Sequence, residues 1–185
     1  AKLAKDISQL QAYLSDVAKE TNKGIDASKD VLLEGTQGLS LSVFYGTYPY
    51  VTGRDTSASA VCSEARVGPT KIYDVLVVFK SFMTRVGTGP LPGELTKEEA
   101  MKRGWVEPAA GTGRDRRSAP FNFELAKKAV AINGATQAAV TKLDALYPEC
   151  KGAKSFDELS EEAKKFIRNV EKQAGVPVGL IGTGQ

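Results

Sequence analysis

The sequence contains no histidine among its 185 residues. Its absence removes the side chain that most often serves as a general base or as a metal ligand. Cysteine is also scarce, because only Cys62 and Cys150 occur and their separation matches no metal-binding spacing. We therefore expect reduced, structural thiols in an intracellular, cytoplasmic protein; a disulfide between the two cysteines is the alternative.

Long hydrophobic runs and a strong net charge are missing as well. No apolar segment approaches the roughly 20 residues that span a bilayer, and no signal peptide opens the chain. The net charge of +3 is too small to indicate nucleic acid or an anionic membrane as a partner. We therefore expect neither a membrane nor a nucleic acid among the partners of this protein.

The composition that remains is that of a folded domain. Hydrophobic residues make up 42% of the chain and charged residues 25%, which are values close to globular averages. A chain of 185 residues is long enough to bury a core as one domain. The first residues, AKLAKD, include no initiating methionine, so we expect the natural start to lie upstream.

Short apolar runs alternate with amphipathic segments along the sequence. The runs at 30–35, 72–80, 136–144 and 177–184 predict strands, the last of them a strand or an extended segment. The segments at 3–21, 57–65, 96–104, 122–133 and 161–175 predict helices. This alternation favours a single α/β domain over residues 1–185, with a mainly parallel central sheet and helices on both faces.

Three long loops follow the predicted strands, at 36–59, 81–95 and 104–120. Open parallel sheets bind their ligands beyond the carboxyl ends of the strands. The third loop carries Arg114, Arg116 and Arg117, whose guanidinium groups suit a phosphate or a carboxylate. Each loop could be a solvated connection, but loops of this length are uncommon unless they are functional or disordered. We therefore predict that these long loops bind the ligands.

The predicted strand at 136–144 ends in Lys142, Leu143 and Asp144. An aspartate at such a position usually caps a turn or a helix. The alternative is a carboxylate at the edge of the sheet that accepts two parallel hydrogen bonds from a planar ring. The pattern of these residues alone leaves both interpretations open.

Six motifs carry a resemblance to a known family. In chain order they are LLEGTQG, YGTYPYVT, TRVGTGPLPGEL, GTGRDRR, TKLD and GVPVGLIGTG. The sequence resembles adenylosuccinate synthetase over essentially its whole length, and the compact archaeal form in particular. The resemblance implies a GTP-dependent ligase of AMP biosynthesis that joins L-aspartate to IMP, with Mg²⁺ as cofactor. It also implies a 6-phosphoryl-IMP intermediate, from which the aspartate amine displaces phosphate, and a homodimer in the full-length enzyme.

The resemblance also implies the residues of three binding sites. IMP would be contacted by Gln37, which would also support catalysis, and by Thr52, Val86 and Arg114. Aspartate would lie against the loop formed by Ala110, Gly111, Thr112, Gly113, Arg114, Asp115 and Arg116. GTP would contact Arg116, Lys142, Leu143, Asp144, Gly182, Thr183 and Gly184, with the Asp144 carboxylate reading the guanine ring.

Two features of the family pattern are missing or altered. The GDEGKGK-like phosphate loop and the catalytic histidine of the N-terminal half do not occur. We therefore expect the chain to be the C-terminal portion of a longer enzyme, to hold no metal ligand itself, and to be inactive alone. The alternatives are a non-catalytic nucleotide-binding fragment, a split subunit, or a phage-type synthetase that acts on a deoxyguanylate. Asp115 also interrupts the basic run of the aspartate loop.

Overall fold

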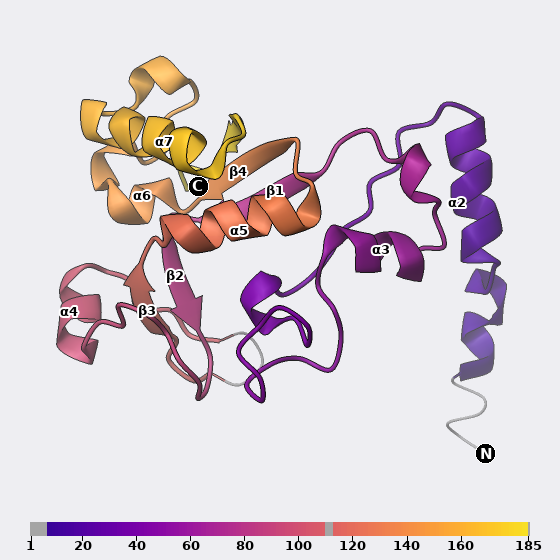
Figure 1. Cartoon of the computed structure of the whole chain (residues 1–185), viewed down its shortest axis with the longest axis horizontal. Coiled ribbons are helices and arrows are strands. Elements are labelled where there is room, and N and C mark those ends of the chain that lie inside the picture. Colours follow the sequence, from indigo (N-terminus) through magenta and orange to yellow (C-terminus); the bar gives the residue numbers. More distant parts are fainter. Residues whose placement is uncertain (1–6, 110–112, 185) are drawn as a thin grey trace.

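A three-stranded parallel sheet forms the centre of the molecule (Figure 1). Its strands are β1 (Leu76–Lys80), β4 (Gln137–Thr141) and β5 (Val178–Ile181), in the spatial order β1-β4-β5. The structure, a computed structural model, describes residues 7–109 and 113–184. Each strand lies within a run that the sequence predicts as a strand. The predicted α/β class, with a parallel sheet and helices, is therefore confirmed.

Six α-helices and five short 3-10 helices are formed within the described ranges. The α-helices are α2 (Val17–Asp26), α3 (Ala58–Glu64), α4 (Lys97–Lys102), α5 (Phe123–Asn133), α6 (Leu143–Leu146) and α7 (Glu161–Ala174). The 3-10 helices are η1 (Gln9–Tyr13), η2 (Leu39–Leu41), η3 (Pro69–Lys71), η4 (Pro148–Cys150) and η5 (Phe156–Glu158). In these same ranges, no helix combines the length and the apolar character that a membrane span requires.

The helices near the sheet begin where the sequence places their caps. Thr96 and Glu99 form a reciprocal capping box at the start of α4. The Asn122 side chain accepts a hydrogen bond from the Leu125 amide at the start of α5, and Ser160 accepts one from Ala163 at the start of α7. The predicted helices at 57–65, 96–104, 122–133 and 161–175 are all confirmed, within a few residues.

The hydrophobic core lies between the sheet and the two long helices α5 and α7, which contact each other. Val140 of β4, Leu143 of α6, and Ile167 and Val170 of α7 are at most 1% exposed. Phe79 and Ile181 pack against them from the neighbouring strands. Burial of these side chains is the main stabilising contribution to this part of the fold.

The opposite face of the sheet is open in the described part of the chain. Val78 of β1 and Leu180 of β5 flank Ala139 in register, so all three side chains point to the same side. Val78 is 60% exposed and Leu180 is 59% exposed. Helices α5 and α7 thus cover the face that carries Phe79, Val140 and Ile181.

A second, two-stranded sheet was not predicted. It pairs β2 (Phe82–Arg85) with β3 (Arg117–Pro120) in an antiparallel register. The sequence analysis placed both segments in loops, and that was wrong because neither segment shows an apolar alternation long enough to predict a strand. Tertiary packing stabilises them instead, since the buried Phe82 ring stacks on Trp105 at 4.7 Å between centroids.

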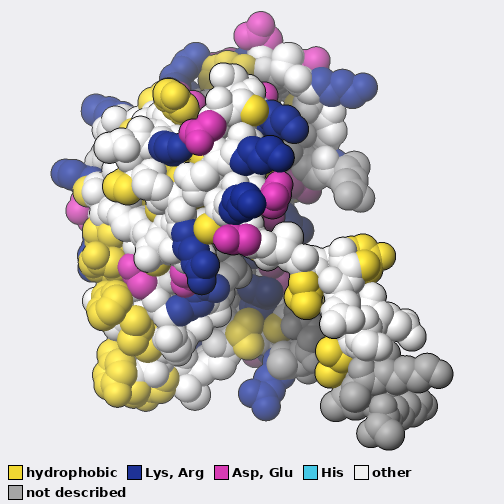
Figure 2. All heavy atoms as spheres, turned by 90° about the vertical axis from the view of Figure 1, so that its right-hand side faces the viewer, with side chains coloured by type: hydrophobic (Ala, Val, Ile, Leu, Met, Phe, Trp, Pro, Cys, Tyr) yellow, Lys and Arg dark blue, Asp and Glu magenta, His cyan; other side chains and the backbone are white. Residues whose placement is uncertain are grey.

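The single helix predicted at 3–21 is interrupted, and residues 1–6 lie outside the described residues. Leu14 is extended after η1, and α2 then starts at Val17 and continues to Asp26. The interruption has a local cause, because the Asp16 side chain accepts a hydrogen bond from the Lys19 amide and caps α2. The apolar positions are exposed, with Leu10 at 58% and Leu14 at 78%. On this side of the molecule hydrophobic side chains reach the surface in several places, among interspersed acidic and basic groups (Figure 2).

The strand predicted at 30–35 is also wrong, since this segment is irregular. A strand needs a neighbour to satisfy its backbone groups. Among the described residues, the segment 30–35 makes no backbone hydrogen bond to another segment. Leu32 is 89% exposed, so its apolar run packs against no core here.

Candidate functional site

The carboxyl ends of the three parallel strands bring several predicted site residues to one edge of the sheet. Lys80 is in register with Thr141, and Lys142 follows directly in the chain. Gly182, which follows β5, donates its amide hydrogen bond to the carbonyl of Val140. This edge is the position at which open parallel sheets bind ligands.

Lys142 has a left-handed backbone with φ of 61° and marks the end of the strand. The strand predicted to run to Asp144 therefore ends at Thr141, and α6 begins at Leu143. Two contacts support this turn: the Ser81 hydroxyl donates to the Lys142 carbonyl at 2.6 Å, and the Leu143 amide donates to Gly182 at 3.0 Å. Leu143 itself is fully buried, so the core anchors the segment.

Asp144 lies in the first turn of α6 and does not cap it, because the N-cap residue is Lys142 and no side-chain cap hydrogen bond is formed there. Its Oδ1 atom is buried and has no hydrogen-bond partner among the described residues. A buried carboxylate oxygen without a partner costs about 1–3 kcal/mol or more. The expected explanation of such an atom is a donor that is supplied from outside the chain.

The closing segment of the chain packs directly against this carboxylate. Gly184 has φ of +86°, and a Cβ on it would lie 2.6 Å from Asp144 Oδ2. Thr183 fixes the approach, because its carbonyl accepts from the Gly152 amide and its hydroxyl donates to the Ala153 carbonyl. The structure therefore brings Lys142, Leu143 and Asp144 together with Gly182, Thr183 and Gly184, as the sequence analysis expected for one pocket.

Gln37 and Thr52 also come together, although fifteen positions separate them in the chain. Gln37 Nε2 donates to Thr52 Oγ1 at 3.1 Å, and Gln37 has a left-handed backbone with φ of 71°. The loop is held by Asp55, which accepts hydrogen bonds from the Ser42 and Ser57 hydroxyls at 2.8 and 2.6 Å. These hydrogen bonds keep the pKa of the Asp55 carboxyl below its usual value, although burial opposes them.

Val86 is tied to the same loop by its neighbour Arg85, a residue that the sequence analysis did not single out. Arg85 is 8% exposed and donates from Nη2 to the Tyr50 carbonyl at 2.6 Å and from Nε to the Thr88 carbonyl at 3.0 Å. Gly89 makes room for it, since a Cβ there would lie 2.6 Å from Arg85 Nη2. An arginine inside an apolar strand, as in the motif TRVG, was the signal that could have identified it.

The base of the predicted aspartate loop is a short antiparallel bridge between Pro108 and Asp115. Ala110, Gly111 and Thr112 lie outside the described residues. Gly113 and Arg114 are both exposed, and the Arg114 carbonyl accepts from the Ala109 amide at 2.8 Å. The Asp115 side chain pairs with Lys97 at 2.9 Å, so it is directed toward α4.

Arg116 and Arg117 differ in their surroundings. Arg116 is half-buried, and its amide donates to the Glu107 carbonyl at 2.8 Å. Arg117 donates to both carboxylate oxygens of Glu94 and to the carbonyls of Gly87 and Gly89. Arg117 therefore holds the loop after β2, which is a structural role.

Glu107 is a second residue that the sequence analysis missed. Its carboxylate contacts Lys80 Nζ at 2.6 Å and Lys142 Nζ at 3.5 Å. Burial raises its pKa, but the hydrogen bond and the charge of Lys80, followed by Lys142, outweigh burial and hold the pKa below the usual value. A lone glutamate before a proline gave no sequence signal for this position.

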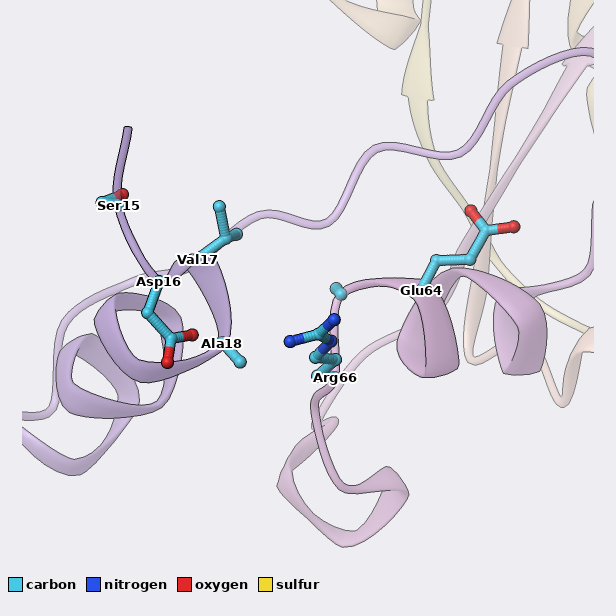
Figure 3. Close-up of a pocket in the computed structure, with 7 residues that line it drawn as sticks. Ser15, Asp16, Val17, Ala18, Glu64 and Arg66 are labelled. Carbon is cyan, nitrogen blue, oxygen red and sulfur yellow. The ribbon is translucent and has the colours of Figure 1, made fainter. Parts of the chain in front are cut away.

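Two of the hollows in the described part of the chain lie in different regions. One, of about 410 Å³, lies between the start of α2 and the end of α3, with Arg66 between them (Figure 3), and none of the predicted site residues lines it. The other, of about 600 Å³, lies along β5 and α7 and includes Thr183 of the closing segment. Within residues 7–109 and 113–184, no group of three or more histidine, cysteine, aspartate or glutamate residues gathers to hold a metal ion.

Comparisons with known proteins relate this chain to one family. A family model described as adenylosuccinate synthetase matches residues 1–148. The adenylosuccinate synthetases of Thermococcus sibiricus and Methanocaldococcus jannaschii are 53% and 52% identical, over 100% and 99% of this chain. These alignments cover 54% and 53% of the two relatives, so the chain spans about half the length of the curated relatives it matches.

Two solved structures share the fold. The fully ligated adenylosuccinate synthetase of Plasmodium falciparum matches with a TM-score of 0.85 and 28% identity, over 95% of this chain and 53% of that one. A cyanophage S-2L succinoaminodeoxyadenylate synthetase, bound to dGMP and dATP, matches with a TM-score of 0.71 over 92% of this chain and 48% of that one. At 21% identity the second likeness shows the fold alone. Together with the matching family model and the archaeal relatives, these findings show that the chain belongs to the adenylosuccinate synthetase family.

Proposed function

We propose that this chain is the C-terminal portion of an adenylosuccinate synthetase, the GTP-dependent ligase that joins L-aspartate to IMP. In this proposal the chain supplies the guanine pocket, the IMP contacts and the aspartate loop. The remaining half of the relatives' length would supply the phosphate loop, the catalytic histidine and the Mg²⁺ ligands. A homodimer and a cytoplasmic location remain predictions of this proposal.

The observation that carries the proposal is the unpartnered Oδ1 of Asp144 at the carboxyl edge of the sheet. Guanine presents a ring N–H and an exocyclic amine side by side, and an ionised carboxylate accepts from both at once. Adenine offers no such donor pair. Gly184 leaves space beside the carboxylate, and Lys142 lies at the start of the same turn. The arrangement therefore favours GTP over ATP as the phosphoryl donor.

The other contacts follow from the residues that the fold brings together. Gln37 and Thr52 would contact the purine and the 5′-phosphate of IMP, and Val86 would approach the ribose. Arg114 and Arg116 would hold the carboxylates of aspartate, because guanidinium groups form strong paired hydrogen bonds with carboxylates. The reaction moves the γ-phosphoryl group of GTP to the purine 6-oxygen. The aspartate nitrogen then bonds to the carbon that bears this oxygen and displaces it as phosphate.

Mg²⁺ would neutralise charge on the phosphates during phosphoryl transfer. Among the described residues no three or more histidine, cysteine, aspartate or glutamate side chains gather, and we assign none of the Mg²⁺ ligands to this part of the chain. Its chemistry would depend on residues from the rest of the enzyme.

The proposal is tested with a chimera in which this chain replaces the matching segment of the Methanocaldococcus jannaschii relative, which is 52% identical. The chimera should form adenylosuccinate from IMP, L-aspartate and GTP, whereas the 185-residue chain alone should not. Product formed by the chain alone would contradict the proposal that the remaining half of the enzyme supplies residues essential for catalysis. Guanine nucleotide binding by a folded chimera that makes no product would instead support a non-catalytic nucleotide-binding protein.

Arg114→Leu provides the matched test of the aspartate loop in the chimera. It should raise the aspartate KM by about tenfold or more, since one charge-assisted contact to a carboxylate is lost. Arg66→Leu is the control, because Arg66 lines the hollow between α2 and α3, which none of the predicted site residues lines. Equal aspartate kinetics for Arg114→Leu and the parent would remove Arg114 from the site.

A further inference from the structure

Glu107 lies between two parts of the proposed site and belongs to neither. Its carboxylate contacts Lys80 at the end of β1 and Lys142 at the turn after β4, at 2.6 and 3.5 Å. Lys80 also donates to the Thr84 hydroxyl of β2 at 3.1 Å, so it is fixed from two sides. One carboxylate thus joins the ends of two parallel strands on the edge that carries Asp144.

The backbone of Glu107 holds the base of the aspartate loop. Its carbonyl accepts the Arg116 amide at 2.8 Å, and the next residue, Pro108, bridges Asp115. The loop between them is closed further by the hydrogen bond from Ala109 to the Arg114 carbonyl at 2.8 Å. Glu107 therefore lies directly before the Pro108–Asp115 bridge at the base of the loop that carries Arg114 and Arg116.

The carboxylate is charged at neutral pH. Burial raises the pKa of Glu107, but Lys80 and Lys142 more than compensate, and the pKa lies below its usual value. The Glu107 side chain is 22% exposed and that of Lys80 is 26% exposed, so solvent only partly screens this pair. Lys142 is 52% exposed and its contact is the weaker of the two.

We propose that Glu107 is a positioning residue that couples the guanine pocket to the aspartate loop. This inference rests on the proposed function of both sites. A nucleotide that orders Lys142 and Asp144 would also fix Glu107, and through its backbone the loop that presents Arg114 and Arg116. Coupling between two sites is reciprocal, so bound aspartate would tighten GTP binding by the same factor.

The first test uses the 185-residue chain itself and needs no substrate. Glu107→Gln keeps the size of the side chain and removes its charge. Amide hydrogen exchange at Arg116 and Ala109 should become about fivefold faster, because the loop base loses its charged anchor. Glu161→Gln is the control, since Glu161 also pairs with a lysine but on α7. Unchanged exchange at both amides in a folded Glu107→Gln chain would overturn the inference.

The second test uses the chimera and measures the aspartate KM at low and at saturating GTP. In the parent, saturating GTP should lower this KM by about fivefold or more. In Glu107→Gln the ratio should approach one, and Glu107→Asp, which keeps the charge on a shorter side chain, should lie between. A purely structural role would alter both KM values without changing their ratio.

The outcomes separate this inference from the proposed function. If the parent and Glu107→Gln chimeras both make product with the same GTP dependence of the aspartate KM, the coupling role fails and the proposed function stands. If the parent chimera makes no product, the proposed function fails. The exchange measurement then still decides whether Glu107 anchors the loop.

Discussion

The chain divides into two regions that are stabilised in different ways. Within residues 7–66 no apolar side chain is buried, and Ser42 and Ser57 are the buried residues. From Val67 onward apolar side chains are buried, and a core cluster forms around the fully buried Val140 and Leu143. The second region is stabilised mainly by hydrophobic burial, whereas the first depends on individual hydrogen bonds and ion pairs.

The two pockets of the proposed site are stabilised in these two different ways. The guanine segment is backed by the buried Leu143, so its turn is held by the core of the domain. The loop of Gln37 and Thr52 is held by Asp55 and Arg85 through polar contacts. We therefore expect the proposed guanine pocket to withstand substitutions that disorder the loop of Gln37 and Thr52, which is the proposed IMP loop. Four predictions test this comparison, in decreasing order of effect.

The largest effect is expected in the core. Ile167→Ala should lower the free energy of unfolding by about 3 kcal/mol, because Ile167 is 1% exposed and the substitution leaves a cavity. Leu32→Ala should change it by less than about 0.5 kcal/mol, since Leu32 is 89% exposed. Urea unfolding of this chain measures both. Equal effects of the two substitutions would contradict the division into two regions.

The next effect concerns the base that Asp144 is proposed to recognise. Asp144→Asn replaces one of two acceptors with a donor, so the guanine amine loses its partner. Xanthine carries a carbonyl at that position and should regain the contact. In the chimera, the preference for GTP over XTP should fall by about 100-fold, which is modest for a site built to pair a buried polar group.

The same variant also separates recognition from the capping role that the structure does not show. Asparagine caps a helix nearly as well as aspartate, so a cap would lose less than about 1 kcal/mol and leave the nucleotide preference unchanged. Asp157→Asn is the matched control, because Asp157 is an exposed residue in η5. An unaltered ratio of GTP to XTP use in a folded Asp144→Asn chimera would remove Asp144 from the pocket.

Sequence patterns predicted the second region well because its signals are local. Thr96, Asn122 and Ser160 each cap a helix that the chain forms, and Gly134 and Gly175 end two of them in the left-handed conformation. The strands at the centre are apolar runs with helices between them. The motifs also predicted one pocket for Asp144 and Gly184, which lie far apart in the sequence, and the fold brings these two residues together.

The remaining features depend on contacts that no local pattern encodes. The run at 30–35 is as apolar as a strand, but it has no neighbour to pair with in the described chain. β3 is a strand because β2 lies beside it and Ser118 is buried, although RSAP has no strand-like alternation. Glu107 acts through a tertiary contact to Lys142 that no sequence signal predicts, whereas Arg85 stands out in the motif TRVG but its partner, the Tyr50 carbonyl, is known only from the fold.

A smaller effect is expected at Arg85, which holds the proposed IMP loop through the Tyr50 carbonyl. Arg85→Met would leave the carbonyls of Tyr50 and Thr88 without their donor and release the loop from β2. In the chimera, the KM for IMP should rise about tenfold, equivalent to one lost charge-assisted hydrogen bond, while the KM for GTP changes less. Lys128→Met on the exposed side of α5 is the control. Equal increases in the KM for IMP and the KM for GTP would indicate general unfolding instead.

The smallest effect is a pH dependence confined to the IMP loop. Burial raises the pKa of Asp55, but hydrogen bonds from Ser57 and Ser42 outweigh burial, so the folded pKa lies below the usual aspartate value. A carboxyl group whose pKa is lowered by folding stabilises the fold above its unfolded pKa, and this contribution is lost as the pH falls through the folded value.

Asp55 is half-exposed, so the contribution to stability should be under about 1 kcal/mol. As the pH falls from about 5 to about 2, through and below the usual aspartate pKa, the protection of the Ser57 amide relative to its intrinsic exchange rate should fall as Asp55 protonates, because this amide donates to Asp55 at 3.1 Å. The Leu159 amide, which lies beside the core, should show no such step. In Asp55→Asn the Ser57 step should disappear, and its persistence there would show that another group controls the loop.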